Sequence, residues 1–181
     1  MRVISGTARG LKLDSPEGLD TRPTLDNVKE AIFSMLFDRV RGAEVLDLFA
    51  GSGALGVEAL SRGAAHCVFA DKNIKSLTVA KNNVSKAKLQ EKAEFIKSDF
   101  RDTILSCAGK NIKFDIIFLD PPYADGFMKE AIELIFENGI VSDKGVIVAE
   151  FDSNTPLDIQ NYKIIKDKRY GRVCISILEA Q

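Results

Sequence analysis

The sequence predicts an α/β protein built on a doubly wound, mostly parallel sheet of seven strands. Three observations support this class. Short apolar runs alternate with amphipathic stretches of helical length between residues 43 and 150, glycines follow the first run, and two β-rich runs near the end of the chain have no helix between them. Strands of four to six residues that alternate with longer helices are typical of such sheets.

Each element follows from its local pattern. Five apolar runs predict parallel strands at residues 44–49, 66–70, 93–96, 114–119 and 145–150. The stretches between them predict helices at 54–62, after an N-cap at Asn73 to about 87, at 101–107 and at 127–136. The runs 162–167 and 173–178 predict a C-terminal antiparallel hairpin at the edge of the sheet.

The beginning of the chain has a different character. Arg2–Ser5 and Leu11–Leu13 predict a small hairpin around Gly6 and Gly10, and an amphipathic helix follows at about residues 25–37. We therefore expect residues 1–40 to form an N-terminal hairpin-and-helix appendage of the same folding unit, and residues 41–181 to form the main domain.

Composition limits the possible functions. The chain has 181 residues, 45% hydrophobic and 28% charged, with 25 Lys and Arg against 26 Asp and Glu. The net charge of −1 excludes a globally basic nucleic-acid binder, although a local basic face stays possible. There is no apolar segment long enough to span a membrane and no signal-peptide pattern, so we expect a cytoplasmic protein. Three isolated cysteines and one histidine predict no metal site.

A glycine motif predicts a cofactor site. Gly51-Ser52-Gly53-Ala54-Leu55-Gly56 matches G-x-G-x-x-G, follows a predicted strand and opens a predicted helix. Gly51 and Gly53 allow a tight turn and close approach of a ligand to the helix N-terminus. Asp71 ends the next strand, 20 positions after Gly51, where a carboxylate can accept hydrogen bonds from ribose hydroxyls. A nucleoside-bearing cofactor is the predicted ligand.

Further acids favour S-adenosylmethionine over NAD as this cofactor. Asp47 is an ionisable residue inside the first strand, where it can pair with the ammonium of a methionine moiety. Asp99 follows the third strand and can accept a hydrogen bond from an adenine amino group, while Phe100 can cover the ring. Asp99 is equally suited to cap the following helix, and the two roles are compatible.

The segment after the fourth strand predicts catalysis. Asp120-Pro121-Pro122-Tyr123 follows the run FDIIFL, and parallel strands direct their carboxyl ends toward the ligand crevice. Two prolines fix the backbone and remove two N–H donors, which leaves the Asp120 carboxylate and the Pro121 carbonyl as a rigid pair of acceptors. Such a pair suits a planar amino group, and Tyr123 can stack on a flipped base. Asp120, Pro121, Pro122 and Tyr123 are therefore the candidate catalytic residues.

Several of these motifs together carry a family resemblance. The segments VISGTARGLKL, TRPTLDNVKEAIFSML, LDLFAGSGALGVEALSRGA, DPPY and KRYGRVCISIL resemble the RsmD family along essentially the whole chain. The resemblance implies a Rossmann-like S-adenosylmethionine-dependent methyltransferase fold. It also implies transfer of a methyl group to the N2 amine of one guanine, guanine 966 in the usual numbering, in 16S ribosomal RNA of the small subunit. S-adenosylhomocysteine is the implied product.

The resemblance also assigns residues. It implies a cofactor site containing Asp47, Gly51, Gly53, Asp71 and Asp99, to which we add the neighbouring Phe49, Lys72 and Phe100. It places Arg22 and Thr24 on the substrate side, and local basic clusters add Arg9, Arg169 and Arg172 as candidate RNA contacts. Lys29 and Ser34 stand where many relatives carry Arg and Asn.

The implied partner is 16S rRNA within the small ribosomal subunit or an assembly intermediate, and we expect a monomer without membrane contact.

The sequence leaves other functions open. A DNA adenine-N6 or cytosine-N4 methyltransferase is compatible with DPPY but needs a target-recognition domain for which the chain has no room. A protein-glutamine methyltransferase more often has Asn in place of Asp120. An NAD-dependent oxidoreductase leaves DPPY without a role, and a non-catalytic S-adenosylmethionine sensor needs no turnover.

Overall fold

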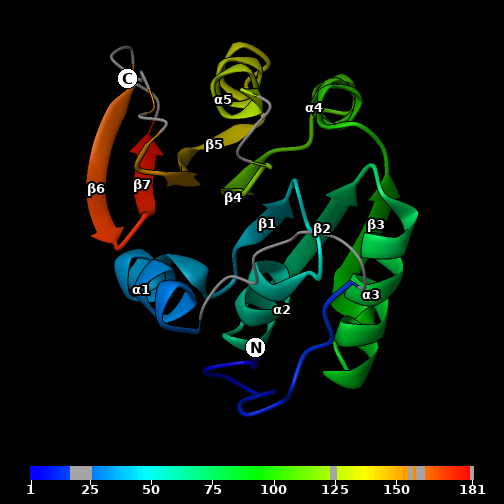
Figure 1. Ribbon diagram of the computed structural model, residues 1–181. Helices are drawn as coiled ribbons and strands as arrows, with labels where there is room; N and C mark the ends of the chain where they lie inside the picture. Colours follow the sequence, from blue (N-terminus) through cyan, green and yellow to red (C-terminus); the bar gives the residue numbers. More distant parts are fainter. Residues whose placement is uncertain (17–25, 123–125, 155–156, 158–161, 180–181) are drawn as a thin grey trace.

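The structure is a seven-stranded sheet with helices on both faces (Figure 1). It is a computed structural model that describes residues 1–16, 26–122, 126–154, 157 and 162–179. The strand order is β3-β2-β1-β4-β5-β7-β6. The strands are β1 (Glu44–Asp47), β2 (His66–Asp71), β3 (Ala93–Lys97), β4 (Phe114–Leu119), β5 (Val141–Asp152), β6 (Lys163–Tyr170) and β7 (Val173–Glu179). The predicted seven-stranded α/β class is confirmed.

Strand direction is parallel except at one position. β1 pairs in parallel with β2 and β4, and the pairs β2–β3 and β4–β5 are also parallel. β7 lies between β5 and β6 and is antiparallel to both. The predicted C-terminal hairpin is therefore present, and its second strand is inserted next to β5. This order differs from the 3-2-1-4-5-6 order of dinucleotide-binding folds.

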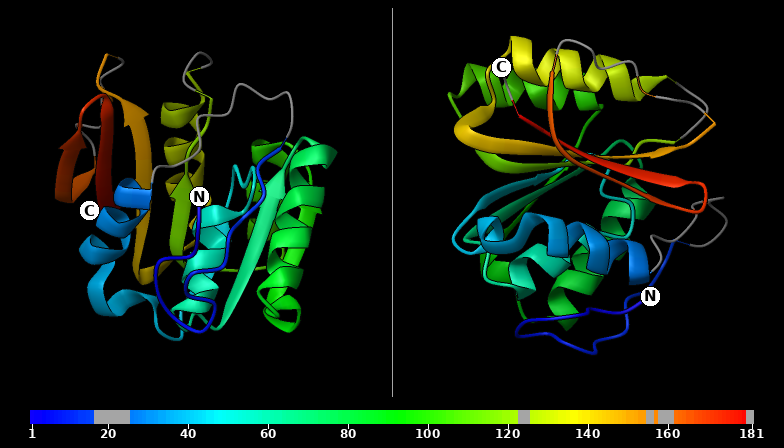
Figure 2. Two further views of the ribbon diagram at one scale, coloured as in Figure 1. Left: turned by 60° about the horizontal axis from the view of Figure 1, so that its bottom comes forward. Right: turned by 90° about the vertical axis from the view of Figure 1, so that its left-hand side faces the viewer.

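Helices form one layer on each face of the sheet, as the right panel of Figure 2 shows. The buried residues of α1, α2 and α3 share one core cluster, and those of α4 and α5 share the other. The helices are α1 (Asp26–Leu36), α2 (Ala54–Ser61), α3 (Ile74–Lys86), α4 (Phe100–Gly109) and α5 (Phe127–Glu137), with short 3-10 helices at Phe37–Val40 and Gln90–Lys92. None of the helices in the described part of the chain is long and apolar enough to cross a membrane.

The burial of β4 explains why its sequence is apolar from Ile116 to Leu119, after the half-buried Asp115. Ile116 and Phe118 belong to the core beneath α1–α3, whereas Ile117 and Leu119 belong to the core beneath α4 and α5. Successive side chains of a strand point to opposite faces, so a strand segment covered on both sides needs apolar residues facing both ways.

Polar residues fix where two helices begin. The Asn73 side chain accepts a hydrogen bond from the Lys75 N–H at 2.9 Å, and the Asp99 side chain accepts one from the Arg101 N–H at 3.1 Å. Both satisfy N–H groups that have no partner within the first turn of a helix. The predicted caps of α3 and α4 are confirmed.

Residues 1–16, here called the N-terminal arm, run along α2 and return (Figure 2). The predicted hairpin is reduced to one antiparallel bridge, between Arg2 and Lys12, with a few flanking hydrogen bonds. Val3 and Leu13 are buried in the same core as α1 and α2. The Thr7 N–H donates to the Ser61 carbonyl at 2.8 Å, which holds the tip of the arm at the C-terminal end of α2.

Candidate active site

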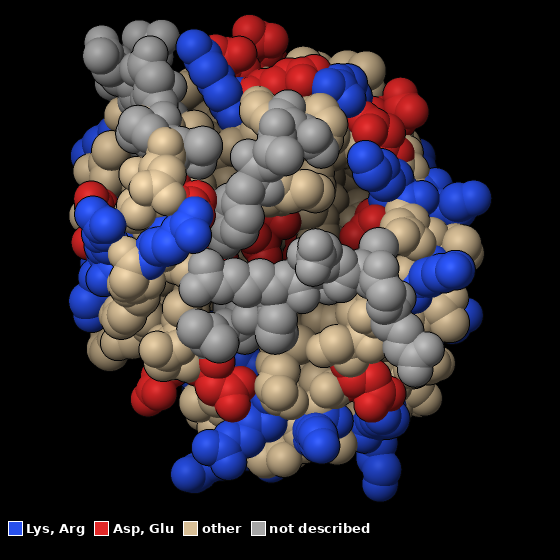
Figure 3. Space-filling model, viewed as in Figure 1, with Lys and Arg blue, Asp and Glu red and all other residues tan. Residues whose placement is uncertain are grey.

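Four acidic side chains lie at the C-terminal ends of four adjacent strands. Asp47 ends β1, Asp71 ends β2, Asp120 follows β4, and Glu150 is near the end of β5. In the register of β4 and β5, Leu119 pairs with Ala149, which makes Asp120 and Glu150 neighbours. The face seen in Figure 3 has a central hollow in which acidic side chains are visible. The predicted site residues at the strand ends are thus brought to one edge of the sheet.

The loop between β1 and α2, residues 48–53, is here called the glycine loop. Gly51 and Gly53 have φ values of 53° and 74°, which an L side chain rarely adopts. The Gly51 N–H donates to Asp71 Oδ2 at 2.9 Å, and the other carboxylate oxygen of Asp71 accepts from the Asn73 N–H at 2.8 Å. Asp71 therefore couples the glycine loop to the end of β2.

Close packing of α2 against β2 explains why the last residue of the motif, Gly56, is a glycine. A Cβ atom at Gly56 would lie 2.3 Å from the Phe69 ring and 2.8 Å from Cys67 Sγ. α2 can therefore approach β2 closely only because this residue has no side chain. Beside Gly51, in contrast, an added Cβ atom would meet nothing nearer than the Phe49 carbonyl at 3.9 Å. The loop is open on the side where a ligand would approach it, as the phosphate- or nucleoside-binding role of such loops requires.

Asp47 is buried and lies directly beneath the start of α2. The residue is 4% exposed, and its Oδ2 accepts a hydrogen bond from the Gly56 N–H at 3.0 Å. The pKa of Asp47 is raised to about 7, chiefly by burial; the Gly56 hydrogen bond opposes the rise, and the charges of Asp120 and Asp71 add to it. A cationic group placed against Asp47 would restore its ionised form. A methionine ammonium fits this environment.

Asp120 and Pro121 lie at the centre of this edge. Asp120 is half-buried, Pro121 is buried and Pro122 is exposed. Burial, followed by the charge of Glu150, raises the pKa of Asp120 well above its usual range. The two acids form a coupled pair, because one negative charge disfavours a second one next to it. Tyr123 lies outside the described residues.

An aromatic cluster borders the glycine loop on the α4 side. The ring of Phe100 lies 5.4 Å from that of Phe49 and 5.5 Å from that of Phe127. Lys72 Nζ lies 5.5 Å above the Phe127 ring, and the Arg101 guanidinium lies 4.3 Å from the Phe100 ring. Phe100 is only 4% exposed, whereas Phe49 is half-buried. Phe49 is therefore the ring of this pair that is available to an adenine.

The predicted RNA-binding residues do not gather at one place. Arg169 and Arg172 lie at the β6–β7 turn, and the pairing of Val173 with Asp152 puts this turn at the same edge as the acids. Arg172 Nη2 is 3.1 Å from Asp152 Oδ2. Arg9 lies instead at the tip of the N-terminal arm, at the opposite end of α2. Arg22 and Thr24 lie outside the described residues.

The sequence interpretation missed three residues near this site: Phe127, Glu150 and Asn83. Glu150 and Phe127 become neighbours of the site only through the sheet order and the packing of α5 against α4. The sequence did contain a signal for Asn83, because a polar residue stands there on the apolar face of α3, three positions after Ala80.

Within the described part of the chain, no group of three or more His, Cys, Asp or Glu residues is arranged to hold a metal ion.

The fold and the site together define a class. A sheet of order 3-2-1-4-5-7-6 with an antiparallel seventh strand, a glycine loop after β1 and acids at the strand ends is the architecture of S-adenosylmethionine-dependent methyltransferases. Among solved structures, the Escherichia coli protein titled "Putative methyltransferase yhhF" superposes with a TM-score of 0.85 at 35% identity, covering 100% of this chain and 99% of that one. An RNA methyltransferase from Salinibacter ruber, solved in complex with S-adenosyl-L-homocysteine, shares the fold with a TM-score of 0.68 at 16% identity, covering 88% and 95%.

The sequence comparisons identify the family within this class. Residues 1–179 match the family described as Conserved hypothetical protein 95, and the chain belongs to it. The Bacillus subtilis protein named "Putative rRNA methyltransferase YlbH" is 39% identical over 98% of this chain and 97% of its own length. "Ribosomal RNA small subunit methyltransferase D" of Haemophilus influenzae is 36% identical over 96% of this chain and 90% of its own length. The resemblance to the RsmD family is confirmed.

Proposed function

We propose that the protein transfers a methyl group from S-adenosylmethionine to the exocyclic N2 amine of guanine 966 in 16S rRNA of the small ribosomal subunit. The observation that carries the proposal is the position of Asp120 directly after β4, next to the glycine loop that follows the adjacent strand β1. The names of the relatives support the RNA class, and the DPPY motif supports an amine as the acceptor.

In this proposal the cofactor lies over the glycine loop. Asp71 accepts from the ribose hydroxyls, Asp47 pairs with the methionine ammonium, and Asp99 with the half-buried Phe49 contacts the adenine. Geometry supports two of these assignments: Asp71 has two oxygens already oriented by backbone N–H groups, and Asp47 is a buried carboxyl group whose raised pKa a neighbouring cation would lower. S-adenosylmethionine supplies an electrophilic methyl group on a sulfonium.

Asp120 and the Pro121 carbonyl hold the acceptor amine. Each accepts one N–H of the amine, which directs the nitrogen lone pair toward the methyl carbon. The nitrogen–carbon bond forms as the carbon–sulfur bond breaks, and the nitrogen then loses one proton. The methylated nitrogen is acidic and releases this proton readily, so the step needs no strong general base. The proton passes to solvent before the next turnover.

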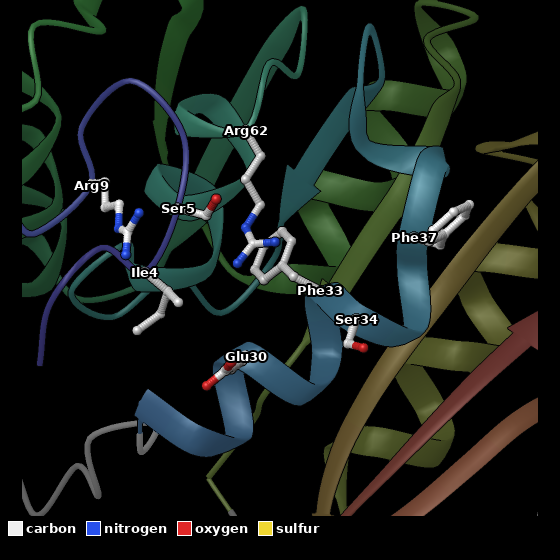
Figure 4. A pocket seen from close by; sticks show the side chains of 8 residues that line it. All are labelled: Ile4, Ser5, Arg9, Glu30, Phe33, Ser34, Phe37 and Arg62. Atoms are coloured by element: carbon white, nitrogen blue, oxygen red, sulfur yellow. The ribbon is translucent and has the colours of Figure 1, made fainter.

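RNA contact is proposed at two places. Arg169 and Arg172 extend the catalytic edge along the β6–β7 turn. A second contact is a groove of about 510 Å³ beside α1 (Figure 4), into which Arg9 and Arg62 project. The Arg62 guanidinium is fixed by Glu58, 2.7 Å from its Nε, and by the Phe33 ring 4.8 Å below it. Orienting an arginine in advance in this way suits a phosphate.

The substrate context and the oligomeric state complete the proposal. With a net charge of −1, the protein has little attraction for naked RNA, which favours a folded ribonucleoprotein substrate. We propose a monomer, because the large apolar side chains exposed in the described part of the chain are scattered over different elements: Phe37, Ile74, Leu105, Ile112 and Ile164.

The test is transfer of labelled methyl from S-adenosylmethionine to three substrates: small subunits that lack the modification, naked 16S rRNA and duplex DNA. Nucleoside mass spectrometry then identifies the product. The proposal expects N2-methylguanosine from the small subunits. Label in adenine or cytosine of DNA would replace it with a DNA methyltransferase, and cofactor binding without any transfer would indicate a sensor.

A further inference from the structure

Asn83 links two segments that are distant in sequence. Its side-chain Nδ2 donates to the Ser52 carbonyl at 2.9 Å and to the Asp14 carbonyl at 3.0 Å. Its Oδ1 accepts from the Asp14 N–H at 2.9 Å. Ser52 belongs to the glycine loop, 31 positions before Asn83, and Asp14 belongs to the N-terminal arm, 69 positions before it.

The position of Asn83 makes this contact specific. The side chain is 0% exposed and stands on the buried face of α3 beside Ala80 and Val84. A buried amide without partners is destabilising, so this asparagine is tolerated only because backbone groups satisfy it. Two donors and one acceptor on one short planar group match the two carbonyls and the N–H that face it.

The rest of the arm is anchored elsewhere. Glu58 accepts from the Ile4 and Ser5 N–H groups at 2.8 and 3.0 Å, which attaches the arm to α2. Within the described part of the chain, Asn83 is the residue whose side chain hydrogen-bonds both the arm and the glycine loop. A displacement of the arm at Asp14 therefore acts on the loop carbonyl at Ser52 through this one amide.

We propose that Asn83 is a positioning residue that couples the N-terminal arm to the glycine loop, so that the conformation of the arm sets the affinity of the loop for S-adenosylmethionine. By linkage, cofactor binding also fixes the arm to the same extent. The inference rests on the proposed position of the cofactor over the glycine loop. It adds a residue that does not touch the cofactor and a segment that lies outside the catalytic motif.

The experiment changes the contact from both of its ends. Asn83→Ala removes the amide, and Asn82→Ala is the matched control on the exposed side of the same helix. Asp14→Pro removes one backbone N–H from the arm and leaves Asn83 in place, with Ser15→Pro as its control. Asp14→Ala further separates the loss of the side-chain ion pair with Lys86 from the loss of the N–H. Dissociation constants for S-adenosylhomocysteine are measured by calorimetry, and folding is checked by thermal unfolding.

We expect Asn83→Ala and Asp14→Pro each to raise the dissociation constant by about tenfold, and the double variant to raise it by about tenfold as well, since both act through one contact. The controls and Asp14→Ala stay within about twofold of the unchanged protein. If Asn83→Ala fails to fold, Asp14→Pro alone must still weaken binding.

Two results would overturn the coupling. One is an unchanged affinity in Asp14→Pro, and the other is a double variant whose effect is the product of the two single effects. A purely structural role for Asn83 would lower the melting temperature without this pattern in affinity. Failure of the unchanged protein to bind S-adenosylhomocysteine would refute the proposed function itself, which is a distinct outcome.

Discussion

Replacing Asp47 with asparagine is expected to stabilise the protein without cofactor while weakening cofactor binding. The pKa of Asp47 is raised by burial from 3.8 in the unfolded chain to about 7 in the folded protein. The folded state therefore binds a proton more tightly than the unfolded state, and stability falls as the pH rises between these two values. At about 1.4 kcal/mol for each pH unit, the loss approaches about 4 kcal/mol above pH 7.

Asparagine has the same shape, carries no charge at any pH and keeps an oxygen for the Gly56 N–H. Asp47→Asn should therefore exceed the unchanged protein in stability by about 4 kcal/mol at pH 8, and the difference should shrink toward zero near pH 4. The same change removes the carboxylate that we assign to the methionine ammonium. The affinity for S-adenosylhomocysteine should fall by about tenfold or more, since a charge-assisted contact is lost.

Urea unfolding at pH 4, 6 and 8 without cofactor measures the first effect, and calorimetry measures the second. Asp143→Asn is the control, because Asp143 is exposed. A variant that is less stable than the unchanged protein at pH 8 would refute the reasoning about burial. A gain in stability with unchanged affinity would refute the assignment of Asp47 to the cofactor.

Three further changes test other contacts. Glu58→Gln leaves the fully buried ammonium of Lys29 without a counter-charge, so urea unfolding should show a loss of about 3–5 kcal/mol; an effect below about 1 kcal/mol would contradict the buried ion pair. Gly56→Ala should lower the free energy of unfolding by about 1–3 kcal/mol because its Cβ meets strand β2, whereas Gly109→Ala, with nothing within 4 Å, should not; equal effects would disprove the packing argument. Asp71→Ala should raise the KM for S-adenosylmethionine by about tenfold or more and change kcat less, in steady-state assays; a change confined to kcat would speak against the ribose contact.

The sequence alone was sufficient to predict the positions of residues whose role depends on the element that they end or begin. Asp71 and Asp120 end predicted strands, and the carboxyl ends of parallel strands meet at one edge, so their proximity follows from the strand pattern alone. Asn73 and Asp99 were recognisable as helix caps because a cap depends on the first turn of its own helix. The run FDIIFL predicted the strand β4 because its residues are apolar apart from Asp115.

The structure was needed where distant segments meet. The coupling of Asp120 to Glu150 depends on the pairing of β4 with β5, which no spacing in the sequence specifies. The burial of Phe100 depends on α5, which brings Phe127 against it. Arg9 carried a charge that suited the catalytic edge, but the hydrogen bonds of the arm to Ser61 put it at the other end of α2. Charge composition does not report such positions.

The most direct test of the account compares cofactor binding and methyl transfer in Asp120→Ala. The dissociation constant for S-adenosylmethionine and the single-turnover rate on small ribosomal subunits are measured on the same preparation. Because Asp120 is assigned to the acceptor amine and the cofactor to other residues, we predict a dissociation constant within about twofold and a rate lower by about 100-fold or more. A rate that stays within about twofold, or a loss of cofactor affinity that accounts for the whole loss of rate, would contradict the account.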